Sequence, residues 1–260
     1  MLTRIITGLV LAPLVVLLFI AGPDWLKAVV IIVAAGICLA ELYAMALPGH
    51  ALERWVGVAL GVGLLTVLWR SPPGQAFGLA AAGLAIPAVV VVLRPLPIET
   101  AALRLFALWG GLIYIVLPLY AALELALAPD PWMLYVGASV WIGDTAAYFT
   151  GRAFGRHKLH PKVSPNKTIE GAIGGLVGSA LGGFAMVKIL DLPLALAPAL
   201  LYSVAGGAIA QMGDLAESLI KRSCGVKDSG TLLPGHGGLL DRIDALIVAL
   251  PFFALVLVLY

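Results

Sequence analysis

Long apolar segments separated by short polar ones make up almost the whole chain. Cut at the clusters of proline, glycine and charge, the pattern gives nine apolar segments: 4–21, 25–47, 53–70, 76–93, 103–127, 132–152, 169–190, 196–219 and 242–260. Most approach the length of about 20 residues that an α-helix needs to cross a bilayer. Since backbone polar groups in lipid must be satisfied within the segment, we predict nine transmembrane helices.

Composition supports an all-α, polytopic membrane protein. Apolar residues make up 62% of the chain and charged residues 12%, with a mean hydropathy of +1.06, whereas soluble domains contain roughly 45–50% and about 25%. The first segment could instead be a cleaved signal peptide, since Arg4 precedes it, but no Ala-x-Ala site follows. Cys38 and Cys224 are too far apart in sequence to suggest a disulfide framework or a metal site.

The cations divide unequally between the two sides that nine spans would create. One side holds thirteen of the sixteen Lys and Arg residues: Arg4, Arg54, Arg94, Arg104, Arg152, Arg156, Lys158, Lys162, Lys167, Lys221, Arg222, Lys227 and Arg242. The other side holds Lys27, Arg70 and Lys188. Because Lys and Arg accumulate in cytoplasmic loops, we expect the amino terminus inside and the carboxyl terminus outside.

The first charged connection, residues 151–171, carries five cations and two histidines. A basic loop alone would also suit a contact with anionic lipid. Its last part, from Ser164 to Gly171, places Asn166, Lys167, Thr168 and Glu170 at a predicted helix start, where free N–H groups favour a phosphate. Upstream, Asp144 lies inside a predicted span, which indicates either a functional carboxylate or a buried hydrogen bond to Trp141 or Tyr148.

The second charged stretch, residues 218–244, holds four Lys or Arg, three Asp and one His in 27 residues. Asp214, Glu217 or Ser218, and Lys221 share one helix face, and Asp241 and Asp244 share another. Carboxylates on two neighbouring helix ends suit Mg²⁺, which binds oxygen ligands together with substrate phosphates. Between them, Gly237 and Gly238 permit a turn whose N–H groups approach an anion. The stretch therefore predicts a site for polyphosphate and a divalent cation.

This stretch resembles the signature of the phosphatidate cytidylyltransferase family. Ser-x-x-Lys-Arg, then Lys-Asp, then His-Gly-Gly-Leu-x-Asp-Arg-Ile-Asp are present at the family's spacing. The segments that begin at Asp144 and at Ser164 are also similar to that family, so the resemblance covers about residues 140–250. It implies transfer of the cytidylyl group of CTP to phosphatidate, which yields CDP-diacylglycerol and pyrophosphate and requires Mg²⁺.

We therefore assign roles as hypotheses. Asp214 and Asp241 are the first metal ligands, with Asp144, Asp228 and Asp244 as further ligands or their supports, and a second cation is left open. Lys167, Lys221, Arg222, Lys227 and Arg242 would hold phosphates, and His236 would bind a phosphate or fix the glycine turn. Ser164, Asn166, Thr168, Glu170, Ser218, Gly237 and Gly238 would contact the substrates. The nucleophile is already an anionic phosphate, so no strong general base is required.

The predicted catalytic region is 131–260, with cytoplasmic loops 152–168 and 220–242, and residues 1–130 are spans to which the sequence assigns no role. We expect a multi-pass protein of the inner (plasma) membrane that meets CTP, phosphatidate and membrane lipid but no nucleic acid, and a homodimer is left open. A transporter or channel is the alternative, but its site would lie near the midplane between repeats, and no clear repeat is present. An enzyme that consumes a CDP-linked lipid would carry an Asp-Gly-x-x-Ala-Arg core, which is absent.

Overall fold

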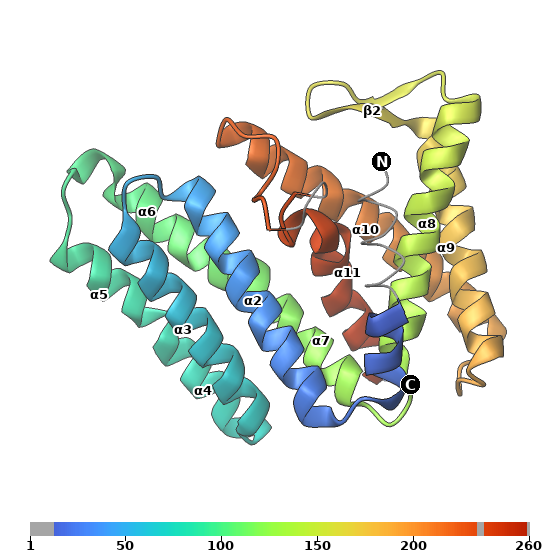
Figure 1. The fold of residues 1–260 in the computed structure, drawn as a ribbon, viewed down its shortest axis with the longest axis horizontal. Helices are drawn as coiled ribbons and strands as arrows, with labels where there is room; N and C mark the ends of the chain where they lie inside the picture. Colours follow the sequence, from blue (N-terminus) through green and yellow to red (C-terminus); the bar gives the residue numbers. More distant parts are fainter. Residues whose placement is uncertain (1–12, 233–236, 259–260) are drawn as a thin grey trace.

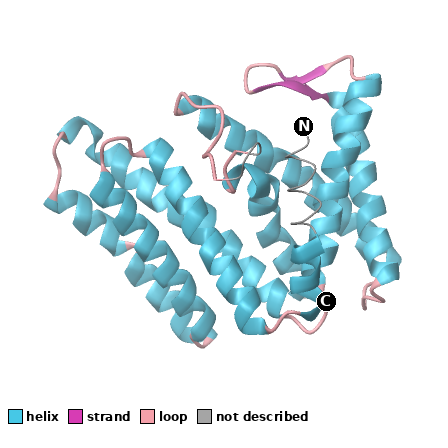
Figure 2. Ribbon diagram, in the orientation of Figure 1, coloured by secondary structure: helices cyan, strands magenta, loops and turns pink. Residues whose placement is uncertain are grey.

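The structure is a computed structural model that describes residues 13–232 and 237–258. Its elements, in chain order, are α2 (Asp24–Ala46), α3 (Ala51–Arg70), α4 (Pro73–Gly83), α5 (Ala85–Leu93), α6 (Ile98–Gly111), η1 (Leu112–Val116), α7 (Leu117–Leu127), α8 (Trp132–Phe154), β1 (Lys158–His160), β2 (Ser164–Thr168), α9 (Ile169–Ile189), α10 (Leu196–Ser223) and α11 (Leu240–Val258). Residues 13–21 are also helical, but most of the predicted segment 4–21 lies outside the described residues. The molecule is thus built almost wholly from helices (Figure 2).

Prolines explain two departures from continuous helix. The predicted segment 76–93 is divided into α4 and α5 at Leu84, and the segment 103–127 contains the π-helical turn η1. A proline inside a helix cannot donate to the carbonyl four residues earlier, and its ring clashes with that carbonyl. The residue four before Pro87 is Gly83, where α4 ends, and the residue four before Pro118 is Tyr114, within η1.

A short hairpin corrects the purely α-helical prediction. Strands β1 and β2 pair antiparallel, with Lys158 opposite Thr168 and His160 opposite Ser164. Pro165 favours an extended conformation for the residue before it, and Thr168 is extended, with φ −126° and ψ 156°, as it caps α9. Because α8 continues to Phe154 and α10 to Ser223, the two charged connections are 155–168 and 224–239, shorter than the predicted loops.

The connections between helices gather at two opposite ends (Figure 1). The α2–α3, α5–α6, α8–α9 and α10–α11 connections lie at the upper end of that view, and the α3–α4, α7–α8 and α9–α10 connections lie at the lower end. Both charged connections are therefore at the same end of the molecule. This arrangement is the one that helices crossing a layer back and forth would produce.

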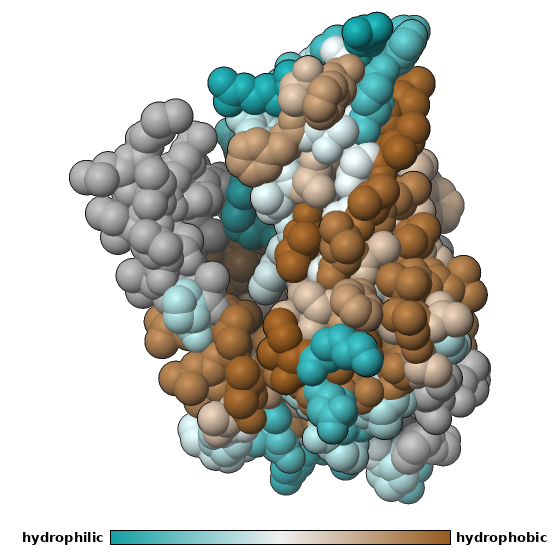
Figure 3. Space-filling view, turned by 90° about the vertical axis from the view of Figure 1, so that its right-hand side faces the viewer, coloured by the Kyte–Doolittle hydropathy of each residue, from teal (hydrophilic) through white to brown (hydrophobic). Residues whose placement is uncertain are grey.

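The surface of the helices is apolar around the middle of the molecule. Figure 3 shows a band of apolar residues with hydrophilic residues above and below it. On α9, Ile173, Val177 and Leu181 follow one another at four-residue intervals and are 57–60% exposed. Among the described residues, five helical stretches are long and apolar enough to cross a membrane: Asp24–Ala46, Ala51–Arg70, Ile98–Leu127, Ile169–Ile189 and Leu196–Ser223. The chain is a multi-pass membrane protein, while the predicted total of nine spans stays a prediction.

Candidate active site

Close packing of α8 against α9 builds one wall of the site. Glycines on α9 face α8, and a Cβ at Gly171 would lie 2.9 Å from the carbonyl oxygen of Ala147. A Cβ at Gly178 would likewise lie 2.9 Å from the carbonyl oxygen of Ile142. Without side chains at these positions, the two backbones approach closely. The approach brings Asp144 on α8 near the hairpin and the start of α9.

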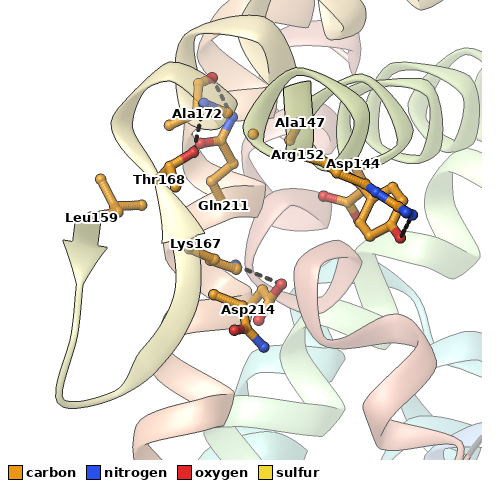
Figure 4. Close-up of a pocket in the computed structure, with 13 residues that line it drawn as sticks. Asp144, Ala147, Arg152, Leu159, Lys167, Thr168, Ala172, Gln211 and Asp214 are labelled. Carbon is orange, nitrogen blue, oxygen red and sulfur yellow. Dashed lines mark hydrogen bonds and ion pairs between the residues drawn. The ribbon is translucent and has the colours of Figure 1, made fainter. Parts of the chain in front are cut away.

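A cavity of about 510 Å³ opens between α8, the hairpin, α9 and α10 (Figure 4). Its lining contains charged, amide and small residues: Asp144, Ala147, Tyr148, Gly151, Arg152, Leu159, Asn166, Lys167, Thr168, Gly171, Ala172, Gln211 and Asp214. Five of these, at 144, 166, 167, 168 and 214, were predicted as site residues. The predicted segment 144–171 therefore meets Asp214 at this cavity, while none of the described residues of the charged stretch 218–244 lines it.

Lys167 and Asp214 point toward each other across the cavity (Figure 4), with Nζ 2.6 Å from Oδ2. Ser218, one turn further along α10, donates to the other carboxylate oxygen of Asp214 at 3.4 Å. Thr168 caps α9 by accepting a hydrogen bond from the N–H of Gly171 at 3.1 Å. A cation, a carboxylate and a helix start thus face one space, which suits a phosphate accompanied by a cation.

Three polar cavity residues, Tyr148, Arg152 and Gln211, were not singled out as site residues from the sequence. Gln211 lies one turn before Asp214 on α10 and donates to the carbonyl of Ala172 at 3.1 Å, which ties α10 to α9. Arg152 Nη1 donates to the hydroxyl of Tyr148 at 3.2 Å, so both side chains lie along the same stretch of α8. A polar residue three positions before Asp214 in an apolar helix was the available signal for Gln211.

A second charged group lies where α10 meets α11. Lys221 Nζ lies 2.6 Å from Asp241 Oδ1 and also forms an ion pair with Glu217. The other oxygen of Asp241 accepts hydrogen bonds from the backbone N–H groups of Ser229 at 2.9 Å and Gly238 at 2.8 Å. Both oxygens of Asp241 are therefore engaged by the protein itself. Lys221 and Asp241 do not line the cavity that holds Asp214.

Comparison with known proteins agrees with this arrangement. The sequence model of the cytidylyltransferase family matches residues 2–260. The chain belongs to the cytidylyltransferase family. Among curated members, phosphatidate cytidylyltransferase of Haemophilus influenzae is 50% identical over 126 residues, which cover 47% of this chain and 44% of the relative. Phosphatidate cytidylyltransferase of Staphylococcus haemolyticus is 47% identical over 127 residues, which cover 49% of each chain. The chain spans about half the length of the curated relatives it matches.

Other predicted site residues lie away from the cavity lining. Glu170 is turned to the α8–α9 connection, where its carboxylate lies 2.6 Å from His157 Nδ1 and accepts from the N–H of Arg156 at 3.0 Å. Arg222 is exposed and donates to the carbonyl of Val226 at 3.3 Å. Lys227, Asp228 and Arg242 are also exposed, and Ser164 begins β2. His236 lies outside the described residues.

The carboxylates fit a divalent cation in part. Asp144, Asp214 and Asp244 interact electrostatically with one another, and carboxylate oxygen is the donor that Mg²⁺ prefers. Their mutual repulsion would be relieved by a bound cation or by a Lys such as Lys167. Within residues 13–232 and 237–258, however, no three His, Cys, Asp or Glu side chains are close enough to hold a metal without help from substrate oxygens. Asp241, which does not line the cavity, fits a ligand role there less well than Asp214, which does.

Proposed function

We propose that this protein transfers the cytidylyl group of CTP to phosphatidate, giving CDP-diacylglycerol and pyrophosphate in phospholipid biosynthesis. The single observation that carries the proposal is the cavity in which Lys167 and Asp214 face one another within a member of the cytidylyltransferase family. The curated relatives are named phosphatidate cytidylyltransferase, which supports these two substrates. The exposed apolar face of α9 beside the cavity suits a lipid substrate that remains in the bilayer.

Cytidylyl transfer requires that the two substrates be positioned and that their negative charges be neutralised. A phosphate oxygen of phosphatidate bonds to the α-phosphorus of CTP while the bond from that phosphorus to the bridging oxygen breaks, and pyrophosphate leaves. Both substrates are anionic, so cationic groups and N–H donors must offset their repulsion. Lys167 and Arg152 supply positive charge in the cavity, and Asn166 supplies amide hydrogen-bonding groups.

We infer that Mg²⁺ is the cofactor, held by Asp214 and Asp144 together with substrate phosphates, with Asp244 near them. When bound, the ion would offset negative charge on the phosphates and the pyrophosphate. Asp214 has a second partner in Lys167, and Ser218 donates to its carboxylate, so the protein itself fixes the position of that side chain. A second cation and the role of Asp228 stay predictions from the sequence.

We propose nine spans, with the amino terminus in the cytoplasm and the cavity open to it. The excess of Lys and Arg in the connections at the upper end of Figure 1 supports this orientation. In a bacterial cell the protein would then lie in the inner membrane and bind cytosolic CTP at the level of the lipid headgroups. Residues 131–260 contribute every side chain that lines the cavity, which supports their assignment as the catalytic region. A homodimer stays open.

The assay is lipid-dependent release of pyrophosphate from labelled CTP by the purified full chain with phosphatidate and Mg²⁺. We expect labelled lipid to form, and Lys167→Ala to lower kcat/KM by about 100-fold because a phosphate-facing cation is lost. Lys162→Ala is the matched control, since Lys162 is exposed in the same connection and does not line the cavity. Its kcat/KM should change by less than about twofold. A folded wild-type protein without lipid-dependent turnover would overturn the proposed function.

A further inference from the structure

Glu41 on α2 reaches the α10–α11 connection from the half of the chain without an assigned role. Its Oε1 accepts a hydrogen bond from the N–H of Leu239 at 2.9 Å. Its Oε2 accepts one from the N–H of Leu240 at 2.9 Å and one from the hydroxyl of Ser229 at 3.0 Å. One carboxylate thereby joins residue 229 to residues 239–240. These two parts of the connection precede and follow residues 233–236, which the structure does not describe.

Asp241 holds nearly the same two points from the other side. Its Oδ2 accepts from the N–H groups of Ser229 and Gly238, and its Oδ1 pairs with Lys221 of α10. Ser229 is therefore bound through its N–H by Asp241 and through its hydroxyl by Glu41. The two carboxylates together hold Ser229, in the middle of the connection, next to the start of α11.

The neighbouring glycines leave room for both carboxylates. A Cβ at Gly230 would lie 2.7 Å from Glu41 Oε1, and Gly238 also lies against the Glu41 carboxylate. Gly237 has a φ of +82°, and a Cβ there would lie 2.6 Å from Asp241 Oδ2. A side chain at these positions would push the carboxylates away from the backbone N–H groups. The glycines at 230, 237 and 238 thus leave the space that the carboxylates of Glu41 and Asp241 occupy.

The position of this contact connects it to the chemistry. Helix α11 begins at Leu240, and the unpaired N–H groups at a helix start carry partial positive charge that a carboxylate stabilises. Asp241 and Asp244 lie in the first turns of this helix, and the backbone of Asp244 lies against α10 next to Asp214, since a Cβ at Gly213 would lie 3.0 Å from the carbonyl oxygen of Asp244. A shift of the start of α11 would move Asp244 relative to the cavity carboxylates.

We propose that Glu41 is a positioning residue for the transfer reaction: it sets the start of α11 and thereby the placement of Asp244 beside the active-site cavity. Residues 1–130 then contribute to catalysis through α2 without touching substrate. This inference rests on the proposed function for its kinetic consequence, but the contact itself can be tested without turnover.

The kinetic test compares Glu41→Gln with Glu99→Gln, both in the full chain. Glu99 is exposed in the first turn of α6, so Glu99→Gln removes one negative charge without disturbing the α10–α11 connection. We expect Glu41→Gln to lower kcat by about 10- to 100-fold, as small displacements of reacting groups do, with KM for CTP changed by less than about threefold. Ser229→Ala should lower kcat less, and the double variant should fall short of the product of the two effects, because both remove one shared hydrogen bond. A kcat for Glu41→Gln equal to that of Glu99→Gln overturns the proposal.

Hydrogen–deuterium exchange supplies a readout that needs no activity. In Glu41→Gln we expect faster exchange in peptides that cover residues 237–240, with peptides of α9 unchanged, because the single amide oxygen can replace only one of the two carboxylate oxygens that accept from Leu239 and Leu240. Unchanged exchange at these residues overturns the positioning role even if activity falls. If the wild type lacks lipid-dependent turnover but Glu41→Gln shows this local change, the proposed function fails while the structural contact stands.

Discussion

Lys221 lies between two carboxylates on different helices. It pairs with Glu217 one turn earlier on α10 and with Asp241 on α11 at 2.6 Å. The side chain of Glu217 is only 1% exposed and that of Lys221 12%. From the sequence, Lys221 was expected to hold a substrate phosphate, but in the structure its charge is used within the protein. A cation in a signature can therefore serve to place carboxylates.

Lys221→Met should destabilise the protein by about 3–5 kcal/mol, because it leaves the carboxylate of Glu217 buried without its cation. The thermal unfolding midpoint in detergent measures this loss. Lys188→Met removes an exposed cation near the end of α9 and should leave the midpoint nearly unchanged. The double variant Glu217→Gln/Lys221→Met should recover part of the loss, since only Asp241, which keeps its two backbone N–H donors, then lacks the cation. Equal midpoints for Lys221→Met and Lys188→Met would contradict the buried ion pair.

Sequence reasoning found residues whose neighbours along the chain reveal them. Asp144 and Asp214 stood out as carboxylates inside predicted spans and Lys167 as a cation just before one, and all three line one cavity. Glu41 did not stand out, because its partners lie almost 200 positions away and are mostly backbone N–H groups. Almost every residue type has a backbone N–H, so the sequence does not reveal which of them bind a carboxylate. The sequence also could not show that Glu170 turns to His157 and away from the cavity.

At the scale of elements, the packing of α8 and α9 depends on glycines whose absence of a side chain lets the backbones touch. Gly178→Ala should destabilise the protein by about 1–3 kcal/mol, since its Cβ would lie 2.9 Å from the carbonyl oxygen of Ile142. Gly63→Ala on α3 is the matched control, because nothing lies within 4 Å of its Cβ position. Gly63→Ala should be neutral or stabilising by about 0.5–1 kcal/mol. Unfolding midpoints that fall equally for both variants would remove the close approach as the cause.

The helices were predictable because apolar segments and their proline and glycine boundaries are local features. From 25–47 onwards, helix ends agree with the predicted segments to within about five residues. The hairpin formed by β1 and β2 was missed, since its sequence Lys-Leu-His and Ser-Pro-Asn-Lys-Thr lacks the apolar alternation that marks a strand. Its two strands are fixed instead by the turn of 161–163 and by the cap at Thr168.

At the scale of the whole molecule, charge and apolar surface have complementary distributions. The two charged connections lie toward one end (Figure 1), the hairpin of the first of them lines the cavity, and the exposed apolar side chains of α9 lie along its length. The buried ion pair of Glu53 with Arg104, in which Arg104 also donates to the carbonyl of Pro95 at 2.8 Å, joins α3 to α6 near that end. These two buried charges are thus paired with each other, while exposed cations such as Arg156 and Lys162 lie in a connection that would face water.

This distribution predicts the sidedness of two cysteines. Cys224 follows α10 and is partly exposed at the end that carries the charged connections, whereas Ser71 lies in the α3–α4 connection at the opposite end. A membrane-impermeant maleimide should label Cys224 in inside-out vesicles and leave it unlabelled in right-side-out vesicles. In a Cys224→Ala background, Ser71→Cys should give the reverse pattern. The buried Cys38 should stay unlabelled in both preparations and so serves as the internal control. Labelling of both positions from the same side would contradict a membrane that separates the two ends. The reverse of the expected pattern would place the cavity on the side opposite the cytoplasm, away from cytosolic CTP.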